Sequence, residues 1–270
     1  MVTSKDNSAE LLKILEKKEE KHMPNWITNR VTLHGADQKE INEVIDFLRS
    51  KDSEVDFNNI IQMPEELRNT TAGSRADYAW AYYHARGLGD FAEIDKMLGY
   101  AWVKREGIKT RDELLDSLSE RHIEVCKFDS PSERLFEGYE DIYKYGEWLY
   151  NLDKKFGCHD WYEWSLEHWG VKWNACDARR EGNILIYETP WDGVPYLMLM
   201  VSEKFTEVTI DYEFADEDFG YNTARYTFVG GEVVAEYEPS DNTIESRQLS
   251  KSILGWEPGE EFGDDNEDVA

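Results

Sequence analysis

The 270-residue chain is short of positive charge: 30 Lys and Arg stand against 57 Asp and Glu, which gives a formal net charge of −27. A surface with this balance repels nucleic acid and anionic membranes, because both are polyanions. We therefore expect no direct nucleic-acid binding and no membrane binding. The expected partner is a basic surface of a host protein or nucleoprotein complex. The alternative is that the acidity only keeps the protein in solution.

Cysteine is scarce as well. Cys126, Cys158 and Cys176 are too few and too scattered for a disulfide framework, and they are typical of a protein in a reducing compartment. No apolar run approaches the roughly 18 residues of a membrane span, and the first residues do not resemble a signal peptide. The sequence therefore predicts a cytoplasmic protein, in the host cell cytoplasm if a phage encodes it.

Signatures of metal sites and of catalysis are also missing. Cys158, His159, His168 and Cys176 contain no Cys-x-x-Cys or His-x-x-x-His pair, so we expect no metal. The chain has no Gly-x-Ser-x-Gly, no phosphate-binding glycine loop ending in Lys-Ser/Thr, and no Gly-x-Gly-x-x-Gly. We therefore expect no cofactor and name no catalytic residue, and an enzyme is a weaker expectation than a binding protein.

Aromatic residues and periodic segments are abundant, and they predict a folded α+β protein. Residues 25–35 alternate as a half-buried strand does. Asp37 is a plausible N-cap for a helix that places Ile41, Val44, Ile45 and Leu48 on one face. A second strand is predicted at residues 55–61. Strand, helix and strand form the first half of a ferredoxin-like split βαβ sheet.

The second half of that sheet is predicted after a long helical region. The pattern predicts strands at 183–188 and 207–214 around a helix at 194–205. An extra C-terminal β-hairpin follows, with strands 221–229 and 232–238 joined by Gly230 and Gly231. The insertion is expected to contain helices at 76–84, 91–105, 111–121 and 132–156.

These patterns divide the chain into five segments. The expected segments are a leading charged helix (1–22), the first half of the ferredoxin-like domain (23–64), a large helical insertion (65–157), the second half with extra strands (158–254), and an acidic disordered tail (255–270).

Three stretches resemble one family. They are Met-Pro-Asn-Trp at 23–26, Asp-Phe-Asn-Asn-Ile-Ile-Gln-Met-Pro-Glu-Glu-Leu at 56–67, and the tryptophan-rich stretch from Trp161 to Ala175. Their order is similar to that in the Api92-like or YubB-like proteins of phages and plasmids. The resemblance implies a ferredoxin-like domain and a mobile-element context, and it brings across no catalytic residue. The chain departs from the family pattern at Val171, where a Thr is expected.

Two features could form a binding surface. One is an aromatic cluster, interpreted either as core or as a hot spot for a partner; its members are Trp161, Trp164, Trp169 and Trp173. The other is acidic. On the helix expected at 132–156, steps of three, four and seven place Glu133, Glu137, Glu140, Asp141 and Glu147 largely on one face. A second acidic stretch contains Asp211, Glu213, Asp216, Glu217 and Asp218.

The acidic residues have two interpretations, a solvated face or an imitation of the regular negative charge of nucleic acid. Our leading hypothesis is a phage or mobile-element accessory protein that inhibits a host nucleic-acid-processing or defence protein, such as a CRISPR nuclease. The alternative is a small-substrate enzyme with a cleft between the ferredoxin-like sheet and the insertion. Its candidate residues are His159, His168 and Lys172.

Overall fold

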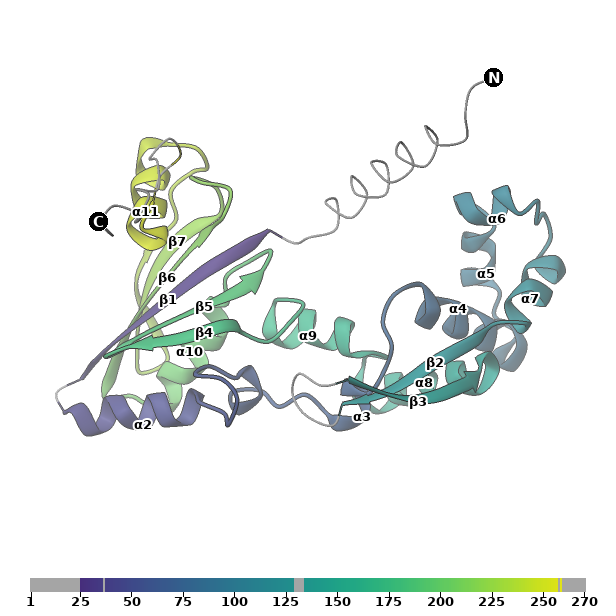
Figure 1. Ribbon diagram of the computed structural model, residues 1–270, viewed down its shortest axis with the longest axis horizontal. Coiled ribbons are helices and arrows are strands. Elements are labelled where there is room, and N and C mark those ends of the chain that lie inside the picture. The colour runs from purple at the N-terminus through teal and green to yellow at the C-terminus, as the bar shows by residue number, and fades with distance from the viewer. Residues whose placement is uncertain (1–24, 36, 129–133, 257, 259–270) are drawn as a thin grey trace, which may run out of the picture. The chain divides into compact units, whose positions relative to one another are not determined.

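The computed structural model describes residues 25–35, 37–128, 134–256 and 258, which fall into two compact units (Figure 1). The sheet unit comprises the described residues up to 48, residues 53–55, and those from 174 onward. The insertion unit comprises residues 49–52 and 56–173. The predicted leading helix, Glu133 and nearly all of the predicted tail lie outside the described residues.

The sheet unit is built on one antiparallel sheet of six strands in the order β4-β5-β1-β6-β7-β8. Three helices accompany the strands, and α2 and α10 cover one face of the sheet. The elements are β1 (Trp26–Gly35), α2 (Gln38–Leu48), β4 (Cys176–Glu181), β5 (Ile184–Pro190), α10 (Pro195–Lys204), β6 (Val208–Asp216), β7 (Thr223–Val229), β8 (Glu232–Tyr237) and α11 (Ile244–Leu254).

The chain order β1-α2-β4-β5-α10-β6 gives the predicted ferredoxin-like topology, because β1 lies between β5 and β6 and β4 lies outside β5. The α+β fold class is therefore confirmed, as is the extra hairpin of β7 and β8. Gly230 and Gly231 at its turn have φ of 58° and 80°, which a two-residue turn between twisted strands requires.

The strand predicted at 55–61 is wrong. This stretch is a loop with one 3-10 turn, η2 (Phe57–Asn59), whose cap Asp56 accepts a hydrogen bond from the Asn58 backbone N–H at 2.9 Å. Such local bonds of Asp and Asn compete with strand pairing. The second strand of the ferredoxin-like core is instead β4, which follows the insertion in the sequence. Its sequence, Cys-Asp-Ala-Arg-Arg-Glu, has no apolar alternation because β4 is an edge strand with mostly exposed side chains.

The core of the sheet unit lies between the sheet and its helices. All four predicted core residues of α2 are buried, because their spacing follows the helical period. On the opposite face, Leu249 and Ile253 of α11 pack on Ala215 of β6. Both faces of the sheet are thus used, and α11, which the periodicity did not predict, covers part of the second one.

The insertion unit combines short helices with a two-stranded hairpin. Thr110 and Glu113 form a capping box at the start of α7. Its elements are η2, α3 (Glu65–Arg68), α4 (Ser74–Tyr83), η3 (His84–Leu88), α5 (Ala92–Met97), α6 (Ala101–Arg105), α7 (Arg111–Ser119), β2 (His122–Phe128), β3 (Arg134–Asp141), α8 (Ile142–Phe156) and α9 (Trp161–Trp169).

The helix predicted at 132–156 begins ten residues later than expected. Residues 134–141 form β3, which pairs antiparallel with β2. Asp141 caps α8 instead, because its side chain accepts hydrogen bonds from the backbone N–H groups of Tyr143 and Lys144 at 2.9 and 3.2 Å. Pairing with β2, the strand just before it in the chain, overrides the helical spacing of the acidic residues.

Candidate functional site

The tryptophan-rich stretch forms α9 and the loop after it, and half of its tryptophans belong to the core. Trp164 and Trp169 are buried and meet edge to face, with ring centroids 5.3 Å apart. Trp161 and Trp173 are half-buried. The four rings therefore form no continuous exposed platform on which a partner could stack.

The second and third stretches that carry the resemblance pack against each other. Trp169 donates its indole N–H to the carbonyl oxygen of Ile61 at 3.0 Å, and its ring lies edge to face with Phe57. Val171, where the resemblance leads us to expect Thr, follows Trp169 by two residues and is buried. These stretches therefore have a structural role inside the insertion unit.

The residues proposed for the enzyme alternative are also held by packing. The His159 ring stacks on Trp80 at 4.7 Å and its Nδ1 lies 2.8 Å from Glu163. His168 stacks on Trp164 at 4.2 Å, and the Lys172 ammonium lies 4.4 Å from the centre of the Trp173 ring.

The thiols and histidines considered for zinc do not converge. Burial, with smaller contributions from Glu163 and other carboxylates, raises the pKa of the Cys158 thiol to about 12, which makes it a poor metal ligand. Within the described ranges, no group of three or more His, Cys, Asp or Glu side chains could hold a metal ion. No helix among these residues is long and apolar enough to cross a membrane.

The first acidic set does not share a helix face. Glu137 and Glu140 lie on β3, where they line a groove of about 670 Å³ together with Glu65 and Glu66 of α3. The other walls of this groove come from β2 and α8, including Tyr145 and Trp148 of α8. Glu147 is exposed on α8, Asp141 is its N-cap, and Glu133 lies outside the described residues.

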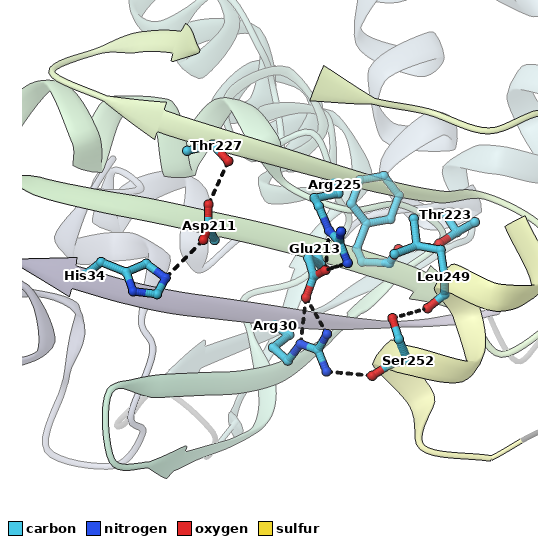
Figure 2. Close-up of polar contacts among 10 residues, drawn as sticks. Arg30, His34, Asp211, Glu213, Thr223, Arg225, Thr227, Leu249 and Ser252 are labelled. Carbon is cyan, nitrogen blue, oxygen red and sulfur yellow. Dashed lines mark hydrogen bonds and ion pairs between the residues drawn. The ribbon is translucent and has the colours of Figure 1, made fainter. Parts of the chain in front are cut away.

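The second acidic set divides into two parts, and the first part is internally neutralised. Figure 2 shows Glu213 of β6 between the guanidinium groups of Arg30 and Arg225, which reach it from the neighbouring strands. Glu213 is only 7% exposed. Asp211, two residues before it, contacts His34 at 3.0 Å and accepts a hydrogen bond from Thr227 at 2.7 Å. These two carboxylates hold β1, β6 and β7 together, and the two arginines leave Glu213 little free charge, whereas Asp211 keeps its charge on a partly exposed side chain.

The second part gathers at one end of the sheet, where β1 begins and β5 and β6 end. We call this the acidic end and define it by its carboxylates Glu188, Asp192, Asp216, Glu217 and Asp218. Asn25 links its two loops: its carbonyl accepts from the Trp191 backbone N–H at 2.8 Å and its side chain donates to Asp216 at 3.2 Å.

Crowding of charge at the acidic end changes its titration. Burial, followed by the charges of Asp177 and Glu217, raises the pKa of Glu188. Burial, followed among the raising causes by the charges of Asp218 and Glu217, also raises the pKa of Asp216. Carboxylates at this end therefore repel one another, and a cationic partner would relieve that repulsion.

Two exposed aromatic side chains accompany these carboxylates. Trp191 is 43% exposed, and Tyr221 is tied to Asp218 through a backbone hydrogen bond of 3.0 Å. Trp191 has a φ of 71°, which is rare for a bulky residue, and Asn222 holds it by donating a side-chain hydrogen bond to its carbonyl at 3.1 Å. We did not identify Trp191, Glu188 or Asp192 from the sequence; the turn signal Pro-Trp-Asp-Gly is the one local sign of an exposed tryptophan there.

Comparisons with known proteins were made at three levels. No curated protein matches the chain. Among solved structures, the crystal structure of a protein api92 from Yersinia pseudotuberculosis aligns over 82% of this chain and 100% of that chain, with 10% identity and a TM-score of 0.37. A family model described as "Ferredoxin-like domain in Api92-like protein" matches residues 168–257, which span β4 to α11. The predicted resemblance is thereby confirmed: residues 168–257 match the ferredoxin-like domain of Api92-like proteins.

Proposed function

We propose that the chain is a non-enzymatic binding protein of a phage or other mobile element, and that its acidic end occupies a basic, nucleic-acid-binding face of a host protein. A defence nuclease, such as a CRISPR effector, is the target class that this mechanism favours. The single observation that carries the proposal is the crowding of carboxylates where β5 and β6 end, next in the sequence to the exposed Trp191 and Tyr221.

The rigidity of this end supports the proposal. The loops after β5 and β6 are fixed by Asn25 and Asn222, so little conformational freedom is lost when a partner binds. Trp and Tyr are the side chains that most often anchor a protein interface, and carboxylates beside them would pair with Lys and Arg. Together they would occupy the positions at which a basic protein holds phosphates.

Competition is the proposed mechanism. Carboxylates held in place form ion pairs with the Lys and Arg side chains of the target. Nucleic acid is then excluded from that basic face of the target. Association between surfaces of opposite charge is fast and weakens as salt rises. The net charge of −27 would steer such an encounter.

The experiment is a capture of host-lysate proteins on the tagged chain, followed by elution with a nucleic-acid competitor at low and high salt. The acidic-end variant carries Asp192→Asn, Glu217→Gln and Asp218→Asn, which keep the oxygen acceptors but remove three charges. The control carries Glu203→Gln, Glu207→Gln and Glu245→Gln, which remove three exposed charges elsewhere.

We expect the wild type to capture a nucleic-acid-binding protein, and the competitor to displace it. The control variant should still capture this protein, and the acidic-end variant should not. Equal capture by both variants would show that net charge alone acts, and absence of any displaceable protein at low salt would overturn the proposal.

The groove of the insertion unit favours a second candidate, a small-substrate enzyme. Four glutamates, two lysines (Lys127 and Lys144) and Trp148 line it, so acidic groups outnumber basic ones, a composition that suits a small cationic or zwitterionic molecule. Thermal-shift screening of metabolites against the wild type and the Glu137→Gln, Glu140→Gln variant tests it. A stabilising cation whose effect disappears in the variant would support this candidate, and no shift with any compound would oppose it.

A further inference from the structure

Strand β8 is an edge of the six-stranded sheet whose outer side is open among the described residues. All six of its residues are exposed, and three of them are large and apolar: Val233, Val234 and Tyr237, with Val234 57% exposed. An edge strand presents unpaired N–H and C=O groups that can pair with another strand. Natural edges are commonly protected by lysine, by proline or by a β-bulge. Strand β8 contains no lysine or proline, and its one irregularity is a bulge at Val234, where the register with β7 shifts.

The other edge of the same sheet differs. Strand β4 carries Arg179 and Arg180 and contains no large apolar residue. On β8 the charged residues are Glu232 and Glu236, and Glu238 follows directly after the strand. By charge, the β4 edge would therefore attract an acidic strand and the β8 edge a basic one.

The negative charge along β8 is not offset by its neighbouring strand. Arg225 of β7 lies opposite Tyr237, but its guanidinium already contacts Glu213. Glu238 accepts a hydrogen bond from the hydroxyl of Tyr226, which neutralises no charge. In the described strands β7 and β8, Arg225 is the one basic side chain, so we expect a cation that pairs with Glu232 or Glu236 to come from a partner.

The turn before β8 determines which backbone groups are available. Val229 and Glu232 are partners across the two-residue turn of Gly230 and Gly231. In such a hairpin these flanking residues exchange both hydrogen bonds, and the next residue directs its N–H and C=O away from the partner strand. Val233 thus presents its backbone groups outward.

We propose that β8 accepts an extended segment of a partner that carries Lys or Arg at every second position, and that this segment adds a seventh strand to the sheet. The basic character of the segment rests on the proposed function. Backbone pairing gives the binding energy and the glutamates select the charge. A second copy of β8 fits less well, because a register centred on Val234 places Glu232 opposite Glu236, and like charges directly opposite are destabilising.

The test uses a fluorescent nine-residue peptide of alternating Lys and Val, and its binding to the full chain is measured by anisotropy at several salt concentrations. The same peptide with N-methyl groups on alternate amides cannot form the ladder, and a Glu-Val peptide has the wrong charge. The chain variants are Val233→Pro, which removes an outward N–H, and its control Val233→Thr, which keeps it. Unfolding curves establish that both variants are folded.

We expect the N-methylated peptide and the Val233→Pro variant to weaken binding by about tenfold or more, and Val233→Thr to leave it unchanged. Equal binding of the methylated and unmethylated peptides would overturn the proposal, and this arm is independent of any variant's stability. A dimer in sedimentation that Val233→Pro converts to a monomer would identify the occupant as a second copy and would overturn it too. Peptide binding that only the acidic-end variant abolishes would favour the proposed function and reject the edge.

Discussion

The indole N–H of Trp169 donates a hydrogen bond to the carbonyl of Ile61 at 3.0 Å, across 108 residues of sequence. It joins α9 to the loop that follows η2. The stretches around Ile61 and Trp169 thus pack against each other, and their residues stabilise the insertion unit.

Replacing Trp169 with Phe tests this role. The variant keeps an aromatic ring but leaves the Ile61 carbonyl without its donor, so we expect the free energy of unfolding to fall by about 1–3 kcal/mol. Urea denaturation followed by circular dichroism measures it. The control is Tyr139→Phe, which changes a highly exposed residue of the same unit. Equal stability of the two variants would contradict a structural role of the hydrogen bond.

Glu213 is expected to matter for stability and not for binding. Glu213→Gln removes the charge that lies between Arg30 and Arg225, which are 25% and 50% exposed in their side chains, so water replaces part of the interaction. We expect a loss of about 1–3 kcal/mol in the free energy of unfolding. The control, Glu207→Gln on the surface, should change it little. A loss of partner binding without a loss of stability would instead place Glu213 in the interface.

Removing the charge of Glu188 should instead raise the free energy of unfolding. Its folded-state pKa is raised by burial and by Asp177 and Glu217, so its ionised form is disfavoured in the folded protein. The resulting loss of folding stability is absent below the ordinary glutamate pKa of about 4.3 and reaches its full size above the raised pKa. We therefore expect Glu188→Gln to be more stable than the wild type at pH 7, with the difference vanishing towards pH 4.

Urea denaturation at a series of pH values measures this difference. Glu203→Gln, at an exposed position of α10, is the matched control and should show no such trend. A Glu188→Gln variant that is less stable than the wild type at pH 7 would show that the acidic end is not under repulsion.

Gly146 allows α4 and α8 to approach closely. A methyl group at this position would lie 2.1 Å from the carbonyl oxygen of Ala79 and 2.6 Å from the Cβ of Tyr83, well inside contact distance. We expect Gly146→Ala to destabilise the protein by about 1–3 kcal/mol or more, because the helices must separate. Thermal unfolding measures this loss. The control, Glu147→Ala at the next and exposed position, should change the stability little.

Local patterns predicted most of the sheet unit and failed at particular places. The alternation of β1 and β6 and the helical spacing of α2 were sufficient, because each element buries one face whatever its neighbours are. Strand β4 carries no such pattern, since an edge strand of polar residues buries almost nothing. Residues 134–141 have helical spacing of carboxylates but pair with β2, the preceding strand, and this pairing rather than the spacing of the charges decides their structure.

The sequence by itself determined the charge, the resemblance to the family, and the elements β1, α2, β5, α10 and β6 of the ferredoxin-like core, but not its strand β4. Only the tertiary structure decided what each carboxylate does, because charge along a chain does not reveal which side chains meet. Strand register places Glu213 between two arginines, whereas the end of β6 and the loop after it bring Glu217 near Glu188 and near Asp216. One acidic stretch therefore became part internal ion pair and part exposed surface, and the register of β6 separates the two.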